Sequence, residues 1–537
     1  MSRIEPANAS GYLGLFSAQD FRLTTGAGAD GPTIASARWY FREQTIAVAK
    51  DPSKVAGFAR GLRTFDDVRA WAMAHSSVAP PDYPPLIWVG APEVARNARI
   101  ASTGTTLLTA HGAPFRIVPK IAMNRSYYDA SSVEFFRRRS VTARGSNSPE
   151  AFVIRSMWPE DFRLGPRAPP LRAMPTDATP AAALRTLMRE ELRGGARAPF
   201  AAWTLWQRPN ASFDWTGRAV LAFIVNGAQG DDDEAHGGHF ALVTGRIAAD
   251  GAIGDWLVNN FYSLDVESEK GIIASPVPLD SYIGDLNSGQ NWYRPSTMLV
   301  AVLSNARSAA LVQSALGRVY NQFYRHQLGY YHPTGNCTSF SIDTLRALGW
   351  DVPARGATSR TLAWLGLPYV AVKHASLQQA ATIFDYLTVD QTRLLPAVAV
   401  EDIFASLTAL IRERGDGTAT PFSLVKGQVI GTLAQMLADD IDALAFLRLP
   451  QFPSSRAFGD AAAISVREAQ ARVPQNPRDA QIIPLPPRPF PEMLRDADLL
   501  PRRMRPSDFA LGVWGALLLI GVPVLVRRWW ARRSRRV

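Results

Sequence analysis

The chain of 537 residues contains a single cysteine, Cys337, and this limits how the fold can be held together. One thiol rules out an intramolecular disulfide and any zinc site built on several cysteines. The fold must therefore be stabilised mainly by burial of apolar side chains, which make up 47% of the residues. Because the chain is too long for one ordinary core, we expect two or three domains.

Changes in composition along the chain predict a protein of the α+β class with several parts. In chain order these are an N-terminal mixed domain of unknown role (1–180), a catalytic domain (181–360), a helical region (361–447), a proline-rich linker (448–506), a transmembrane helix (507–528) and an arginine-rich tail (529–537). Apolar spacing predicts helices over 65–76, 304–328 and 424–449. The segment 281–298 has no clear place in this scheme.

The predicted membrane segment Phe509–Val526 is eighteen residues long and carries no charged side chain. That is at the short end of what a helix needs to cross a bilayer. Trp529, Trp530 and several arginines follow, as in an interfacial belt. We therefore expect a single-pass protein with a C-terminal anchor in a bacterial inner membrane. The side on which the catalytic domain lies stays open.

The net charge of +11 is concentrated at the C-terminus. The last eleven residues contain six arginines and no acid, so the rest of the chain carries +11 − 6 = +5. This is modest for a chain of this size, and we expect no nucleic-acid partner.

The middle of the chain predicts an antiparallel pair of strands. "RAVLAFIVNG" (218–227) is typical of a buried strand, and a hairpin follows it, with a strand over 239–247, a turn at Asp250-Gly251 and a return strand over about 253–264. A two-residue loop would pair residues whose numbers sum to 501. Asn260 then lies on the same face as His239 and diagonal to it, whereas Asn259 points away unless a bulge shifts the register.

The stretch "TGNCTSFSIDTLRALG" predicts a helix with Asn336 or Thr334 as N-cap and Gly349 at its C-terminal end. Cys337 then falls in the first turn, where the helix dipole favours a thiolate and free N–H groups can hold an oxyanion. The opposing interpretation is a small buried hydrophobic residue, which is the usual role of a lone cysteine.

A nucleophilic thiol needs a base, and His239 is the candidate. A polar side chain beside a histidine fixes its tautomer and orientation. The candidate catalytic residues are therefore Cys337, His239 and Asn260, with Asn259 as the alternative third group. The opposing interpretation of His239 is a structural histidine with satisfied hydrogen bonds.

These motifs resemble those of a known family. The strand "GGHFALVTG" followed by the cysteine helix "GNCTSFSIDTLRALG" resembles the circularly permuted papain-like hydrolases of the NlpC-type superfamily, in the branch of lecithin:retinol acyltransferase-like enzymes. The resemblance covers roughly residues 200–350. It implies an antiparallel sheet packed on the cysteine helix. In that branch the third catalytic group is often histidine, whereas the candidate in this chain is Asn260.

The resemblance implies a thiol-dependent hydrolase or acyltransferase acting on an amide, ester or thioester, with no cofactor. The expected membrane anchor makes a lipid, a lipoprotein or a cell-wall peptide the expected substrate. A first alternative is a metal-dependent hydrolase, in which His236, His239 and the acids of "GDDDEAHGGH" act with His326 or His332. A second alternative is a non-catalytic scaffold tethered to a membrane.

Overall fold

The structure is a computed structural model. It describes residues 5–7, 11–28, 37–38, 41, 44–75, 80–108, 113–117, 126–172, 179, 182–184, 187, 199–227, 238–262, 273–292, 295–331, 333–357, 359–373, 375–415 and 433–454. In this part of the chain the fold is mixed α+β, as predicted.

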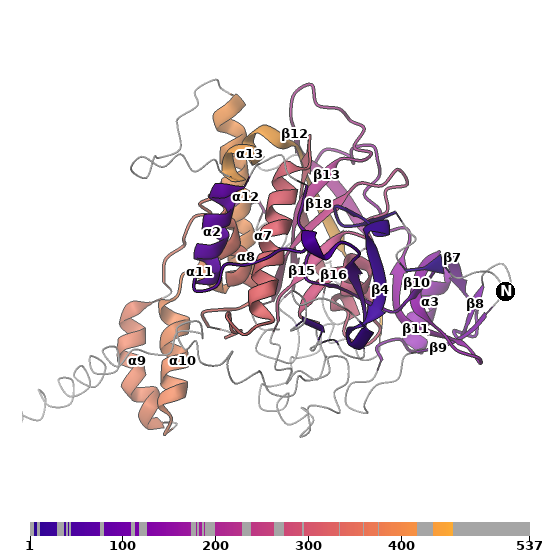
Figure 1. The fold of residues 1–537 in the computed structure, drawn as a ribbon, viewed down its shortest axis with the longest axis horizontal. Helices are drawn as coiled ribbons and strands as arrows, with labels where there is room; N and C mark the ends of the chain where they lie inside the picture. Colours follow the sequence, from indigo (N-terminus) through magenta and orange to yellow (C-terminus); the bar gives the residue numbers. More distant parts are fainter. Residues whose placement is uncertain are drawn as a thin grey trace, which may run out of the picture.

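A seven-stranded antiparallel sheet forms the middle of the molecule (Figure 1). Its strands in spatial order are β12 (Ala201–Gln207), β18 (Ile441–Leu449), β17 (Ser296–Leu303), β13 (Ala219–Asn226), β14 (His239–Arg246), β15 (Leu257–Asn260) and β16 (Ser275–Pro278). Every residue of β13 and of β17 is buried. Apart from Asn226, Ser296 and Thr297, both strands are apolar, as expected for strands covered on both faces. The predicted strand over 218–227 is confirmed as β13.

Helices cover one face of this sheet (Figure 1). They are α2 (Thr64–Ala74), α7 (Arg307–Phe323), α8 (Cys337–Ala347), α11 (Gln391–Leu394), α12 (Pro396–Gly415) and α13 (Leu433–Asp440). The helices predicted over 65–76 and 304–328 are confirmed as α2 and α7. Two further helices, α9 (Arg360–Lys373) and α10 (Leu377–Thr388), form a hairpin that projects from this layer (Figure 1).

A second sheet lies on the other side of the central sheet (Figure 1). Its order is β1 (Glu5–Pro6), β7 (Glu93–Ile100), β10 (Val141–Asn147), β11 (Phe152–Pro159), β9 (Ala113–Ile117) and β8 (Thr106–Leu108). Helix α6 (Leu279–Gly284) contacts β11 of this sheet and β16 of the central sheet, and the short 3-10 helix η5 (Gln290–Trp292) packs against α6. Helix α3 (Ala130–Arg137) lies beside β7 (Figure 1). The unplaced segment 281–298 thus supplies most of α6, η5 and the start of β17.

Smaller strands near the N-terminus complete the fold. They form a three-stranded sheet of β4 (Phe21–Thr25), β5 (Thr45–Ala49) and β6 (Ile87–Gly90), and a pair of β2 (Tyr12–Leu13) and β3 (Phe16–Ser17). Three 3-10 turns accompany them: η1 (Ala18–Asp20), η2 (Gly26–Gly28) and η4 (Pro52–Lys54).

The prediction of one helix over 424–449 is wrong at its C-terminal end. The chain is helical in α13, but residues 441–449 form β18, which lies between β12 and β17 in the central sheet. Seven of its nine residues are buried, the exceptions being Asp442 and Arg448. A short apolar run of this kind cannot be assigned to helix or strand from periodicity alone. The strand belongs to the same sheet as the residues of chemical interest.

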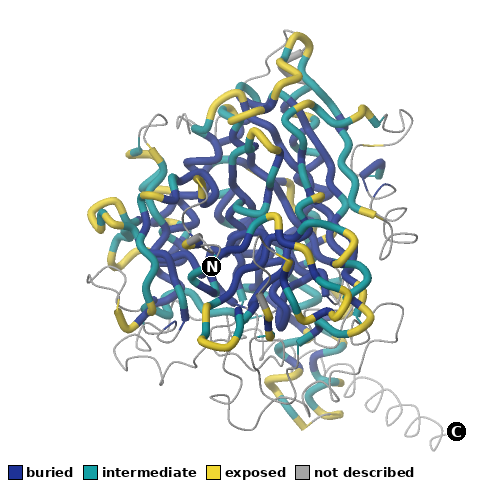
Figure 2. Tube along the Cα trace, turned by 90° about the vertical axis from the view of Figure 1, so that its right-hand side faces the viewer, coloured by how far each residue is buried: buried dark blue, intermediate teal, exposed yellow. Residues whose placement is uncertain are grey.

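The boundary predicted at residue 180 does not separate two cores. One cluster of buried apolar side chains runs from Leu15 to Phe452 and includes residues of both sheets and of the helical layer. In Figure 2 the buried residues accordingly gather in one interior. Buried ion pairs add to this contact, since Asp67 of α2 pairs with Arg318 of α7 and Arg155 of β11 pairs with Asp285.

The expectation of a single-pass membrane protein is corrected. Among the helices in the described residues, none is both long enough and apolar enough to cross a bilayer. The segment 507–528, on which the expectation depended, lies outside the described residues, as does most of the predicted linker 448–506.

Candidate active site

His239 is the first residue of β14 and is fully buried. Side chains alternate between the two faces of a sheet along each strand. Thr244 of the same strand hydrogen-bonds to Gln313 of α7 at 2.6 Å, so Thr244 points to the helical face. His239 lies five residues earlier and therefore points to the opposite face. Its ring centroid is 6.3 Å from that of Tyr282 in α6.

The hairpin register predicted from the sequence is confirmed. Leu242 of β14 pairs with Asn259 of β15, and 242 + 259 = 501. The strands stop short of the turn, which occupies residues 247–256 and places Gly251 at a φ of 76°, in the left-handed region that glycine favours. The register nevertheless puts Asn260 on the face of His239.

Asn260 and His239 form a buried hydrogen bond. His239 Nε2 lies 2.6 Å from Asn260 Oδ1, and both residues are at most 2% exposed. Asn260 Nδ2 donates to the carbonyl oxygen of Ile273, which fixes the amide with Oδ1 toward the imidazole. A carbonyl oxygen can only accept, so the neutral imidazole carries its proton on Nε2. Nδ1 is then the ring nitrogen able to take up a proton.

Asn259 is not the partner of His239. Its Nδ2 donates to Gln313 Oε1 at 3.1 Å, and Gln313 Nε2 donates to Asn259 Oδ1 at 3.0 Å. This paired amide contact fastens β15 to α7 on the helical face. Of the two asparagines that the sequence left open, Asn260 is the one beside the imidazole.

Cys337 begins α8, as predicted, and Asn336 caps the helix. Asn336 Oδ1 accepts from the N–H groups of Thr338 and Ser339, each at 3.0 Å, while Ser339 Oγ accepts from the Asn336 N–H at 2.8 Å. This is a capping box. The cap uses the backbone N–H groups of Thr338 and Ser339, so the Cys337 N–H is the one in the first turn that it does not use. The oxyanion donors expected from this helix are therefore reduced to one.

The far end of α8 also matches its prediction. Leu348 is the C-cap, and Gly349 follows it with a φ of 83°. The N–H of Trp350 donates to the carbonyl of Leu345, and that of Gly349 donates to Arg346, both at 3.0 Å. These bonds define a Schellman motif, which ends the helix and turns the chain away.

Cys337 and His239 lie at the same end of the central sheet but on opposite faces. Phe340 of α8 packs against Phe261 with ring centroids 5.2 Å apart, and Phe261 directly follows Asn260. Cys337 and His239 therefore lie at the same end of the central sheet. Phe261 lies two residues after Asn259, so its side chain points to the same face of the sheet. Helix α8 therefore packs on the helical face, opposite to the imidazole.

Among the described residues, no hydrogen bond joins Cys337 and His239. Cys337 Sγ instead lies 3.8 Å from Thr338 Oγ1, and the residue is 2% exposed. The structure therefore brings His239 and Asn260 together and leaves the thiol on the other side of the sheet end.

A chain of buried polar groups continues from His239 along the same row of the sheet. Asn226 pairs with His239 across the strands; its Oδ1 accepts from the Tyr282 hydroxyl, and its Nδ2 donates to Ser296 Oγ at 2.6 Å. Ser296 Oγ donates to Asn291 Oδ1 at 2.6 Å. Sequence reasoning missed these residues. Tyr282, Asn291 and Ser296 all belong to the unplaced segment 281–298, and their polarity within apolar surroundings was the available signal.

The proposed metal site finds no support in the described residues. No group of three histidine, cysteine or carboxylate side chains is placed to hold an ion in this part of the chain. His236, His332 and the acids at 231–234 lie outside the described residues. His326 is partly buried, and this burial lowers the pKa of its imidazole from the ordinary 6.5.

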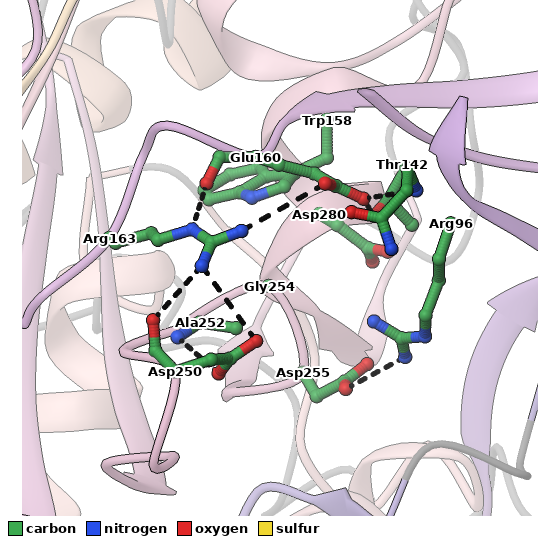
Figure 3. A pocket seen from close by; sticks show the side chains of 11 residues that line it. Arg96, Thr142, Trp158, Glu160, Arg163, Asp250, Ala252, Gly254, Asp255 and Asp280 are labelled. Carbon is green, nitrogen blue, oxygen red and sulfur yellow. Dashed lines mark hydrogen bonds and ion pairs between the residues drawn. The ribbon is translucent and has the colours of Figure 1, made fainter. Parts of the chain in front are cut away.

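A second polar cluster lies between the two sheets, around a small pocket (Figure 3). The fully buried Arg144 of β10 donates to Asp280 at 2.5 Å and to Asp255 at 2.9 Å, and Arg96 also pairs with Asp255 at 3.3 Å. Burial alone would lower the pKa of Arg144, but the two carboxylates raise it. The acids around the pocket are largely paired with arginines, so this cluster fastens the sheets together.

Comparisons with known proteins gave no match. No protein-family model matches it, and no match is found among curated proteins or solved structures. The resemblance to permuted papain-like hydrolases therefore stays a prediction.

Proposed function

We propose that the protein is a thiol-dependent hydrolase or acyltransferase, with Cys337 as nucleophile, His239 as base and Asn260 as the residue that orients the base. The observation that carries the proposal is the 2.6 Å hydrogen bond between His239 Nε2 and Asn260 Oδ1. It holds the imidazole in the tautomer whose Nδ1 can accept a proton.

The position of the thiol gives further support. Cys337 lies at the N-terminus of an eleven-residue helix with its own capping box, at the same end of the sheet as His239. The chain order, a histidine strand before a cysteine helix, agrees with a permuted papain-like arrangement, whereas the position of His239 on the sheet face opposite to α8 does not.

The reaction would proceed by covalent catalysis. His239 Nδ1 takes the proton of the Cys337 thiol, and the sulfur attacks the carbonyl carbon of an amide, ester or thioester. The imidazolium then returns the proton to the leaving amine, alcohol or thiol. Water, or an acceptor amine or alcohol, attacks the resulting thioester and regenerates the Cys337 thiol. The Cys337 N–H is the helix donor that remains for the oxyanion.

This chemistry requires the thiol and the imidazole to meet around the end of the sheet. They are not hydrogen-bonded to each other, and they lie on opposite faces of the sheet. The approach of substrate carbonyl to Cys337 must therefore bring the two groups together.

Alkylation of Cys337 by iodoacetamide as a function of pH tests the proposal without a known substrate. The only cysteine gives a single signal. We expect the parent to react faster than His239→Ala, because the base is what generates the nucleophilic thiolate. His326→Asn is the matched histidine control and should react as the parent does.

An inert Cys337, or a rate that does not depend on His239, would overturn the proposal. In that case the buried thiol is a packing residue and the non-catalytic scaffold becomes the leading interpretation.

A further inference from the structure

The pocket between the two sheets has room for a small molecule. Its lining comes from β7, β10, β11, α6 and the turn between β14 and β15. In Figure 3, Arg163 and Arg96 stand on opposite sides of the pocket, with Glu160 along one edge and Asp255 along the other. Together with its mouth the pocket measures about 490 Å³, a size typical of small-molecule sites.

Glu160, which directly follows β11, has one carboxylate oxygen satisfied and one unsatisfied. Its side chain is 10% exposed. Oε1 accepts from the Asn97 N–H at 2.7 Å and from the Thr142 hydroxyl at 2.8 Å. Oε2 is buried, and no described group donates a hydrogen bond to it. Arg163 Nη2 is 3.9 Å away, too far for a hydrogen bond. Because a buried carboxylate oxygen without a donor is costly, Glu160 Oε2 is a candidate binding group of the pocket.

Two other carboxylates of the lining are engaged by arginines. Asp255 accepts from Arg144 at 2.9 Å through Oδ1 and from Arg96 at 3.3 Å through Oδ2. Asp280 accepts from Arg144 at 2.5 Å. These pairs fasten the sheets together, as described above, and they leave Glu160 Oε2 out.

Gly254 keeps the space in front of two other lining residues open. A Cβ atom at this position would lie 3.3 Å from Asp280 Cβ and 3.6 Å from Trp158 Nε1. The indole N–H of Trp158 can only donate a hydrogen bond, whereas Glu160 Oε2 can only accept one. Both residues lie along the same edge of the pocket in Figure 3. The pocket therefore offers a donor and an acceptor to the same ligand.

The charges around the pocket favour a neutral ligand. Four carboxylates and two guanidinium groups line it, namely Glu160, Asp250, Asp255, Asp280, Arg96 and Arg163. Arg144 pairs with two of the acids from behind, so the group carries −4 + 3 = −1. A cation at Glu160 Oε2 would be repelled by Arg163, and an anion would be repelled by Glu160 itself. A neutral hydroxyl group both donates and accepts, so it suits this mixed lining.

We propose that this pocket binds a neutral sugar, with one hydroxyl donating to Glu160 Oε2 and another accepting from Trp158 Nε1. A glycerol group offers the same hydroxyl chemistry, but a sugar ring holds its hydroxyls in fixed positions and loses less conformational freedom on binding. The binding is non-covalent, and Cys337 does not line the pocket, so this proposal is independent of the function proposed above.

Saturation-transfer NMR titrations of the full-length chain test the proposal. The probes are D-glucose, D-galactose and N-acetyl-D-glucosamine, compared with glycerol, methylguanidinium and inorganic phosphate. We expect at least one sugar to bind saturably with a Kd of about 10 mM or lower. Glu160→Gln keeps an acceptor for Asn97 and Thr142 but removes the charged acceptor, so it should raise this Kd about tenfold. Asp161→Asn is the matched control: Asp161 is exposed, pairs with Arg139 and does not line the pocket, so the Kd should not change.

Gly254→Ala gives a second test that leaves every charge in place. Its methyl group enters the space in front of Asp280 and Trp158 and should also weaken binding, and Gly254 is not in the left-handed region, so alanine is compatible with the backbone. An equal Kd in the parent and in Glu160→Gln would overturn the proposal, because the sugar would then bind elsewhere. Binding of methylguanidinium or phosphate in place of the sugars, binding of glycerol as tightly as the sugars, or no saturable binding of any probe would also overturn it.

Discussion

His239 Nε2 and Asn260 Oδ1 lie 2.6 Å apart inside the protein and join the first residue of β14 to the last residue of β15. The Asn260 amide is held in place by the Ile273 carbonyl, so the direction of this hydrogen bond is determined by its surroundings. The pair is what gives the central sheet a defined acid–base group at one end.

Replacing Asn260 by alanine should release the imidazole. We expect a loss of about 1–3 kcal/mol of stability, because His239 loses its buried acceptor, and a smaller fraction of the tautomer protonated on Nε2. Nitrogen NMR of the histidine ring, together with urea unfolding, measures both. Asn259→Ala is the control: it should cost stability through Gln313 and leave the tautomer unchanged. The same tautomer in Asn260→Ala would contradict the assignment.

The cap of α8 should matter for the position of the thiol. Asn336→Ala removes the acceptor of the Thr338 and Ser339 amides and should cost about 1–2 kcal/mol in urea unfolding. Asn336→Asp keeps the acceptor and should recover part of that loss. If Asn336→Ala is as stable as the parent, the first turn of α8 does not depend on its cap.

Two neighbouring acids in α2 should behave differently. Asp67 is buried and accepts from Arg318 at 2.6 Å, from Gln322 at 2.8 Å and from the Ala59 amide at 2.9 Å. Asp67→Ala should therefore cost about 3–5 kcal/mol, since it leaves the Arg318 charge with little compensation. Asp66 forms an exposed pair with Arg69, and Asp66→Ala should cost less than about 1 kcal/mol. Equal losses in denaturant unfolding would contradict this assignment.

Stability should fall at mildly acidic pH partly because of His326. Burial lowers the pKa of its imidazole below 6.5 in the folded protein. As pH falls through 6.5, the unfolded chain takes up this proton first, so the free energy of unfolding decreases until the lowered folded pKa is passed. His326→Asn should flatten this decrease, and asparagine tolerates the φ of 56° at this position. Identical pH profiles of urea midpoints in parent and variant would refute the prediction.

Local patterns in the candidate site were predictable. The register of β14 and β15 followed from the alternation of side chains and the position of one turn, and it identified Asn260 as the residue beside His239. The cap at Asn336 and the glycine at 349 followed from the residue types that helix ends require. Each of these features depends on residues only a few positions apart, or on a single hairpin.

Contacts between distant parts of the chain were not predictable in this way. The hydrogen bonds from Tyr282 to Asn226 and from Asn226 to Ser296 join residues 56 and 70 positions apart. Nothing in the local pattern of "SYIGDLNSGQNWYRPSTM" indicates which strand will supply its partners. The pairing of β18 with β12 and β17 likewise joins segments that are far apart in the sequence.

The sequence by itself determined the class of fold, the hairpin register, the ends of α8 and the place of Cys337 in its first turn, because these depend on short-range backbone hydrogen bonds and side-chain alternation. Only the tertiary structure decided that α8 packs on the face opposite His239, that β18 completes the central sheet and that residues 1–180 share its core. These arrangements depend on which apolar surfaces exclude water together, and that is a property of the whole chain rather than of any segment.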